Sequence, residues 1–264
     1  MLKVDNVKKT FSPGTVNEKR ALKNITFHME PSDFVTVIGG NGAGKSTMLN
    51  AIAGIFKVDT GTIMINDADV TKLPEHKRAV YIGRVFQDTR MGTASDMTIE
   101  ENMAMALRRG KARGLRKGIT KAERNLFRER LAILDLGLEN RMTAKTGLLS
   151  GGQRQALTLL MATMTKPELL LLDEHTAALD PKTAKKVLEL TNQIITEDKL
   201  TALMITHNMQ DALRLGNRIM MLHEGRVLID LQREEKKNLQ VADLLKMFEK
   251  ASGTGMASDK ILLS

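Results

Sequence analysis

The sequence predicts an α/β protein with a mostly parallel sheet at its core, an antiparallel β subdomain at the N-terminus and a helical subdomain inserted in the middle. Two stretches carry this prediction. The strand-like run Phe34–Ile38 leads into the phosphate-binding pattern G-x-x-x-x-G-K-S and a helix-favouring run from Met48. The run Leu169–Leu172 is unbroken leucine, which is typical of a strand buried on both faces of a parallel sheet.

Hydrophobic periodicity and turn signals place the remaining elements. Residues 67–69 are expected to form a turn. Residues 1–250 are expected to form one domain, with the helical subdomain at about 88–155, and residues 251–264 a mobile tail. Strands are expected at 2–11, 21–30, 34–39, 61–66, 81–86, 168–173, 201–206, 218–223 and 226–231, and helices at 45–56, about 98–109, about 120–136, 151–164, 181–198, 209–215 and 238–250.

Composition limits the function. The 264 residues are 42% hydrophobic and 27% charged, as in soluble globular proteins. A formal charge of +9 suits a phosphate-rich ligand, a nucleic acid or an anionic membrane surface. Aromatic residues are only 3%, which disfavours nucleic acid because single strands need stacking platforms. Cysteine is absent, and apolar runs fall far short of the ~20 residues that span a bilayer.

The glycine-rich turn predicts a phosphate site. Gly39 and Gly44 stand at the fixed glycine positions, so the backbone can wrap closely around an anion. The loop N–H groups and the start of the following helix add partial positive charge. Lys45 is placed to reach the β- and γ-phosphates of a nucleotide, and the Ser46 hydroxyl to ligate Mg²⁺.

A pair of carboxylates follows the leucine strand. Asp173 ends this strand, and a carboxylate there lies beside the phosphate loop of a neighbouring strand, where it can hold Mg²⁺ directly or through water. The adjacent Glu174 can orient or deprotonate a water molecule.

A second anion-binding helix start is predicted at Leu149-Ser-Gly-Gly-Gln153. One chain needs only one phosphate cradle. A second cradle therefore implies a site that another subunit completes.

Together these motifs resemble the nucleotide-binding subunits of ATP-binding cassette (ABC) transporters, over residues 1 to about 232. The resemblance rests on six segments in the family's order: Walker A at Gly39–Thr47, the Q-loop at Gln87, the signature at Leu149–Gln153, Walker B at Leu169–Glu174, the D-loop at Ala178–Asp180 and the H-loop at His207.

The resemblance implies a P-loop NTPase core in the ABC ATPase fold, with ATP and Mg²⁺ as ligands. Glu174, His207 and Gln87 would be catalytic: Gln87 would contact Mg²⁺ or the attacking water, and His207 the γ-phosphate. The metal would be held by Ser46, Gln87 and Asp173. The nucleotide would be bound by Phe11, Gly39, Asn41, Gly42, Ala43, Gly44, Lys45, Ser46, Thr47, Ser150, Gly151, Gly152, Gln153 and Asp180.

Some of these residues would act on a nucleotide that is bound by another subunit. Ser150 and Gly152 would bind the γ-phosphate of ATP held by the partner.

Phe11 would stack on adenine. The alternative is that Phe11 is an ordinary core residue of a strand. His175 departs from the family, which has proline there; it would bond within the D-loop or have no task, and nothing marks it as a metal ligand.

The resemblance also implies partners. Two copies, or this chain and a paralogue, would sandwich two ATP molecules. Integral membrane permease subunits on separate chains would dock at the helical subdomain near Gln87, with a solute-binding protein as a further partner. The chain would then lie at the cytoplasmic face of the cell membrane. The segment 173–181 resembles ATPases of bacterial uptake systems for small solutes such as amino acids.

Other classes of phosphate-loop protein are alternatives to an ABC transporter subunit. A non-transport ABC ATPase, for example of cluster assembly, fits the length. A GTPase would carry Asn-Lys-x-Asp, which is absent, and a kinase needs no Leu-Ser-Gly-Gly-Gln.

The helical subdomain carries a basic run. It is either a solvated loop or a contact with lipid headgroups or an acidic partner. The run comprises Arg108, Arg109, Lys111, Arg113, Arg116 and Lys117.

Overall fold

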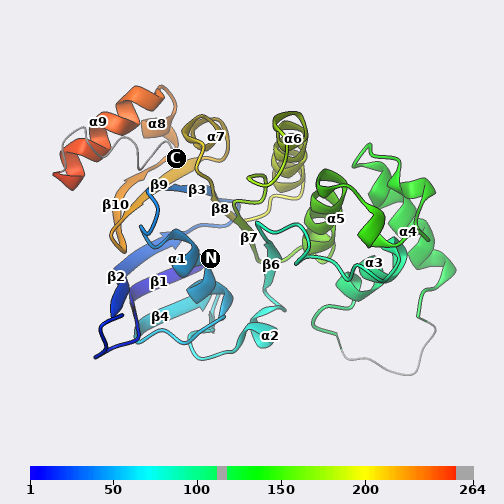
Figure 1. Ribbon diagram of the computed structural model, residues 1–264, viewed down its shortest axis with the longest axis horizontal. Helices are drawn as coiled ribbons and strands as arrows, with labels where there is room; N and C mark the ends of the chain where they lie inside the picture. The colour runs from blue at the N-terminus through cyan, green and yellow to red at the C-terminus, as the bar shows by residue number, and fades with distance from the viewer. Residues whose placement is uncertain (112–117, 254–264) are drawn as a thin grey trace.

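The computed structural model describes residues 1–111 and 118–253, and Figure 1 shows their arrangement. Two sheets form the body of the protein, and a helical lobe lies beside one edge of the larger sheet. Arg113, Arg116 and Lys117 of the basic run and residues 254–264 of the expected tail lie outside the described residues.

The larger sheet has six strands in the order β10-β9-β3-β8-β7-β6. All neighbouring strands are parallel except β9 and β10, which form a hairpin, so the predicted mostly parallel sheet is confirmed. Its strands are β3 (Phe34–Ile38), β6 (Ile82–Val85), β7 (Leu169–Asp173), β8 (Ala202–Ile205), β9 (Arg218–His223) and β10 (Arg226–Leu231).

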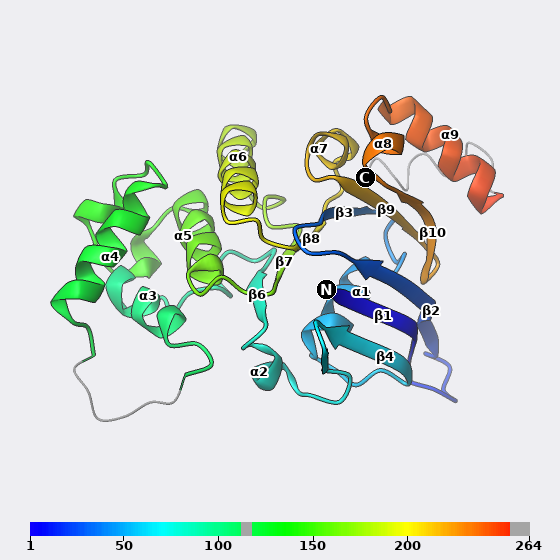
Figure 2. The same cartoon turned by 180° about the vertical axis from the view of Figure 1, so that it is seen from behind.

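The smaller sheet is antiparallel, with the order β2-β1-β4-β5. Helix α1 (Lys45–Ala53) packs between the two sheets (Figure 2), and one apolar core joins all three. The strands are β1 (Leu2–Phe11), β2 (Lys19–Met29), β4 (Thr60–Ile65) and β5 (Ala68–Asp69). The expected turn at 67–69 is partly wrong, because Ala68 and Asp69 pair with the end of β4.

The helical lobe contains α3 (Ile99–Leu107), α4 (Lys121–Ala132) and the start of α5 (Gly151–Thr163). Thr120 and Glu123 form a capping box at α4, and Thr98 and Glu101 form another at α3. Short 3₁₀ turns occupy Leu138–Asn140 and Thr146–Leu148. The lobe's apolar side chains merge with the core behind β7 and β8, so the lobe is fixed to the sheet through α5.

The remaining helices are α2 (Glu75–Arg78), α6 (Pro181–Glu197), α7 (Met209–Arg214), α8 (Arg233–Lys236) and α9 (Val241–Ser252). Helix α9 ends at Ser252, so the first two residues of the expected tail are helical. No helix in the described part of the chain is long and apolar enough to cross a membrane.

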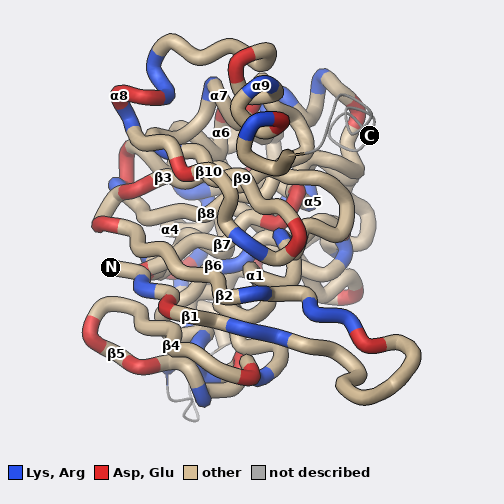
Figure 3. Tube along the Cα trace, turned by 90° about the vertical axis from the view of Figure 1, so that its left-hand side faces the viewer, with Lys and Arg blue, Asp and Glu red and all other residues tan. Residues whose placement is uncertain are grey.

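Charged residues of both signs alternate over the antiparallel sheet and its turns (Figure 3). Lys9 pairs with Asp59 at 2.9 Å, and Lys23 with Glu224 at 3.3 Å. In that view the net positive charge is therefore interrupted by acidic residues rather than gathered on a continuous basic face.

Candidate nucleotide-binding site

The phosphate loop connects β3 to α1 and needs glycine at two positions. A Cβ on Gly39 would lie 2.2 Å from the carbonyl oxygen of Leu222, and one on Gly44 would lie 2.8 Å from that of Ala21. Both glycines also have positive φ, 149° and 102°, which side chains disfavour. The loop borders a cavity of about 380 Å³, lined by Lys19, Ala21, Asn41, Gly42, Ala43, Gly44, Lys45, Ser46, Thr47, Gln87, Glu174 and His207.

Lys45 is the buried cation of this cavity. Its Nζ donates hydrogen bonds to the carbonyl oxygens of Gly39 at 2.7 Å and Gly40 at 3.2 Å. Burial lowers the pKa of Lys45, and the nearby carboxylates Glu174 and Asp173 oppose that shift. The ammonium group is therefore held at the mouth of the loop, where an incoming phosphate can replace the carbonyl contacts.

Asp173 and Ser46 come together beside the loop. The Ser46 hydroxyl lies 3.4 Å from Asp173 Oδ1 and donates to it. Burial raises the pKa of Asp173, whereas the neighbouring Arg84 opposes the rise. A hydroxyl and a carboxylate are hard oxygen donors of the kind that Mg²⁺ takes, so the donor set fits the expected metal.

Glu174 and His207 also meet. They follow the neighbouring parallel strands β7 and β8, and His207 Nε2 lies 2.6 Å from Glu174 Oε1. The Glu174 backbone adopts φ 45°, an uncommon value for a residue other than glycine, and its N–H donates to Ile205 O at 3.1 Å. The strained turn aims the carboxylate at the cavity, where it can take a proton from water.

Gln87 follows β6 and lines the same cavity. The residue before Gln87 is hydrogen-bonded to the helical lobe, because Gln155 Nε2 of α5 donates to Phe86 O at 3.0 Å. This link was not expected from the sequence, in which Gln155 is one polar residue in an otherwise ordinary helical pattern.

The signature and D-loop residues lie elsewhere in the chain. Ser150 caps α5 and accepts a hydrogen bond from the Gln153 N–H at 3.3 Å. Asp180 caps α6 in the same way, accepting from Thr183 N at 3.1 Å. Within the described part of the chain, the cavity lining does not include the expected contacts Ser150, Gly151, Gly152, Gln153 and Asp180.

Phe11 lies near the cavity without lining it. Its ring packs edge-to-face on Phe56 with 5.2 Å between centroids, and its side chain is part of the exposed surface. Its cross-strand partner Lys19 does line the cavity. Nothing in the sequence marks Lys19 or Ala21, since β2 carries no nucleotide motif.

His175 is buried next to Glu174 in the chain. Its Nε2 lies 3.0 Å from the Thr191 hydroxyl of α6, so its hydrogen bond goes to a helix rather than within the D-loop.

This geometry defines a class of protein: a phosphate-loop nucleotide-binding protein whose Ser150–Gln153 helix start lies outside its own cavity. The family profile for ABC transporters matches residues 22–177. A tyrosine transport ATP-binding protein of Clostridioides difficile (strain R20291) is 44% identical over 252 residues, which cover 95% of this chain and 100% of that protein. An ABC transporter ATP-binding protein of Bacillus subtilis (strain 168) is 34% identical over 256 residues, 94% of each chain. The chain therefore belongs to the ABC transporter family, as an ATP-binding and ATP-hydrolysing subunit.

A solved structure supports the same fold. The dimeric post-hydrolysis state of an ATP-binding cassette bound to ADP and phosphate matches this chain with a TM-score of 0.75 at 33% identity. The match covers 88% of this chain and 98% of that one. The predicted fold class and family resemblance are confirmed, and the cluster-assembly, GTPase and kinase alternatives give way to them.

Proposed function

We propose that this chain hydrolyses MgATP in a site shared between two ATPase subunits and thereby drives uptake of an amino-acid-type solute. One observation carries the proposal. The cavity gathers Lys45, Ser46, Gln87, Glu174 and His207, whereas the signature motif lies outside it on the same chain.

Each residue of the cavity has a task in this proposal. Lys45 would leave the loop carbonyls and meet the β- and γ-phosphates. Ser46 and Asp173, with Gln87, would hold Mg²⁺, which when bound offsets charge on the phosphate oxygens. Glu174 would accept the proton of the attacking water, and His207, 2.6 Å away, would hold that carboxylate in place and reach the γ-phosphate.

The other half of the site would come from a second subunit. The Ser150 cap places the N–H groups at the start of α5 on the exposed side of the helical lobe. An anion favours such a helix start. In a head-to-tail pair, Ser150, Gly151, Gly152 and Gln153 of one chain would close over the nucleotide of the other, with Asp180 beside them. Binding of ATP would then close the pair, and hydrolysis would open it.

Membrane permease subunits would dock in a second cavity, of about 670 Å³, between the helical lobe and the sheet. Met91 and Met105 are 65% and 46% exposed and line the same cavity, and apolar side chains exposed together can be covered by a partner. Phe86 lines the same cavity and directly precedes Gln87. Docking there would place the chain at the cytoplasmic face of the membrane, with a solute-binding protein as a further component.

The cargo class rests on similarity. The C. difficile relative is described as a tyrosine transport protein and aligns along its full length. Uptake of labelled amino acids by the assembled transporter, with thiamine as the comparison solute, checks this assignment; uptake of thiamine alone would contradict it.

The first prediction tests hydrolysis. Glu174→Gln removes the base but keeps the shape of the side chain, and a general base contributes typically ~10²–10⁴-fold. Steady-state ATP turnover should fall by about two or more orders of magnitude, while ATP affinity in equilibrium titration is retained. Glu129→Gln, the same change on an exposed carboxylate of α4, is the matched control and should leave turnover unchanged. Turnover near wild type in Glu174→Gln would place the base elsewhere.

A further inference from the structure

Arg84 is a buried arginine whose charge faces the proposed metal carboxylate. It lies on β6, next to β7, and its side chain is 13% exposed. Its Nη2 donates to Asn50 Oδ1 of α1 at 2.5 Å and lies 3.8 Å from Asp173 Oδ2. The guanidinium stacks on the Phe86 ring, 4.6 Å from its centroid, and Nη1 is 4.0 Å from Glu75. Contacts from three sides therefore fix where the cation sits.

The two oxygens of Asp173 have different neighbours. Oδ1 accepts from the Ser46 hydroxyl at 3.4 Å, and Oδ2 faces the Arg84 guanidinium. The attraction between Oδ2 and the guanidinium favours the orientation in which Oδ1 is turned toward Ser46. The oxygen that remains beside the phosphate loop is the one that a metal at Ser46 would use.

Asp173 needs a cationic partner for an electrostatic reason. Its side chain is only 14% exposed, and a second carboxylate, Glu174, follows it directly in the chain. A buried carboxylate next to a second carboxylate is costly unless a cation is close.

Simple core filling does not account for the arrangement. Among the described residues, Arg84 Nε and Nη1 have no hydrogen-bond partner, so the side chain uses few of its donors. An arginine that served only to fill space would be replaceable by an apolar side chain of similar length. What the fold preserves is the direction of the charge, set by Asn50 and Phe86.

We propose that Arg84 is a positioning residue for magnesium-dependent nucleotide binding, because it holds the Asp173 carboxylate turned toward Ser46. The inference rests on the proposed role of Asp173 as the metal carboxylate. Arg84 acts through Asp173 and touches neither nucleotide nor metal. Groups that orient a metal-binding side chain typically change metal affinity by ~10–100-fold when they are removed.

The test separates metal from nucleotide. Binding of a fluorescent ATP analogue is titrated with Mg²⁺, and again in EDTA. Arg84→Met should raise the half-saturating Mg²⁺ concentration by about tenfold or more, while affinity in EDTA changes by less than about twofold. Arg84→Lys keeps the charge but cannot reach Asn50 and Asp173 together, so it should recover only part of the loss. Asn50→Ala frees the guanidinium without removing it, so it should raise the half-saturating Mg²⁺ concentration by a smaller factor. If Arg84→Met fails to fold, Asn50→Ala tests the inference in its place.

A double-mutant cycle decides between the possible outcomes. In the Asp173→Asn background, Arg84→Met should have no further effect on the Mg²⁺ requirement. An equal effect in both backgrounds, or an unchanged Mg²⁺ requirement in Arg84→Met, overturns the inference. If Asp173→Asn alone leaves the Mg²⁺ requirement unchanged, the proposed metal role of Asp173 fails first, which is a different result.

Discussion

At the scale of single residues, His175 shows how the turn at Glu174 is tied to the fold. The Thr191 hydroxyl donates to Val187 O at 2.8 Å, so its oxygen is left to accept from His175 Nε2 at 3.0 Å. This assigns the neutral ring with hydrogen on Nε2. Because His175 follows Glu174 directly, the bond anchors to helix α6 the turn that carries the Glu174 carboxylate.

The second prediction follows from this burial. Burial lowers the pKa of His175 from 6.5 to about 4. Above about pH 6.5 neither the folded nor the unfolded chain binds a proton there. Between about pH 6.5 and 4 only the unfolded chain does, so stability falls across this window, by up to about 3 kcal/mol at ~1.4 kcal/mol per pKa unit. Urea unfolding at both pH values should show this extra loss in wild type but not in His175→Gln. Equal losses would mean that the histidine titrates normally when folded.

Much of the site could be predicted residue by residue. Lys45, Ser46, Glu174 and His207 carry a chemical pattern at fixed places in the chain, and the structure brings them to one cavity. Arg84 could not be found this way. It occupies a position in a short strand where an apolar residue is expected, and its role appears only once β6 lies beside β7.

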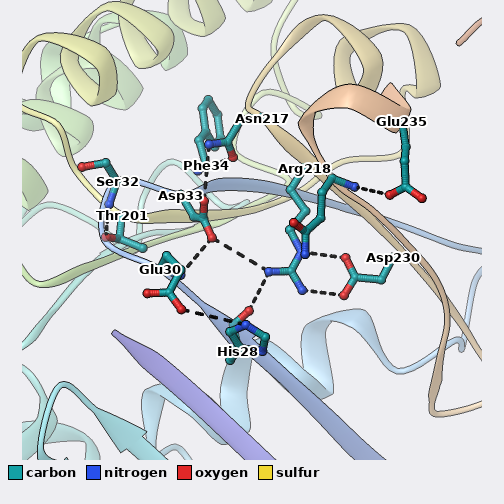
Figure 4. Close-up of polar contacts among 11 residues, drawn as sticks. His28, Glu30, Ser32, Asp33, Phe34, Thr201, Asn217, Arg218, Asp230 and Glu235 are labelled. Atoms are coloured by element: carbon teal, nitrogen blue, oxygen red, sulfur yellow. Dashed lines mark hydrogen bonds and ion pairs between the residues drawn. The ribbon is translucent and has the colours of Figure 1, made fainter. Parts of the chain in front are cut away.

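At the scale of elements, Arg218 connects the two sheets (Figure 4). Its guanidinium contacts Asp230 of β10 through two bonds, at 2.6 Å from Nε and 2.5 Å from Nη2. Nη1 donates to His28 O of β2 at 2.6 Å and lies 3.9 Å from Asp33. These bonds raise the pKa of Arg218, with Asp230 as the main cause. The clamp lies at the end of the sheet opposite to the phosphate loop, since Asp33 precedes β3 and Gly39 follows it.

The third prediction concerns this clamp. Arg218→Met removes a buried cation and leaves His28 O without its donor. Breaking a buried pair in this way typically costs about 3–5 kcal/mol; because Asp230 is 31% exposed, the lower end is expected. Urea unfolding measures the loss. Arg128→Met, on an exposed position of α4, is the control. A loss below about 0.5 kcal/mol, typical of surface changes, would show that the apolar core alone joins the sheets.

Long elements were easier to predict than short ones. Strands β9 and β10 match their expected bounds, and α5 and α6 end within one residue of theirs. Helices α2 and α8 were missed because four residues hold barely one helical turn and show no apolar period. Both α4 and α5 begin within one residue of their expected starts, and a capping box stands at each.

At the scale of the whole molecule, the expected nucleotide contacts fall into two groups that lie apart within one chain. The cavity lies at the carboxyl ends of β3, β7 and β8, where ligands bind in open parallel sheets. The signature helix α5 starts in the helical lobe, apart from that cavity. The sequence indicated two anion-binding segments, the phosphate loop and the start of α5. Only the fold shows that the two lie apart within one chain.

The fourth prediction concerns the shared site. In Glu174→Gln, hydrolysis is blocked and a negative charge near the triphosphate is removed, so the ATP-bound pair should accumulate. A large cationic side chain at the signature serine should obstruct the partner's nucleotide. Glu174→Gln/Ser150→Arg should therefore bind ATP as a monomer, with the monomer's own affinity little changed.

Sedimentation velocity of Glu174→Gln with MgATP tests the shared site most directly. A site built from two chains predicts a dimer that forms with MgATP, disappears without nucleotide and is absent in the Glu174→Gln/Ser150→Arg variant. A Glu174→Gln chain that is saturated with MgATP and still sediments as a monomer, or a dimer that Ser150→Arg leaves intact, would contradict a site built from two chains.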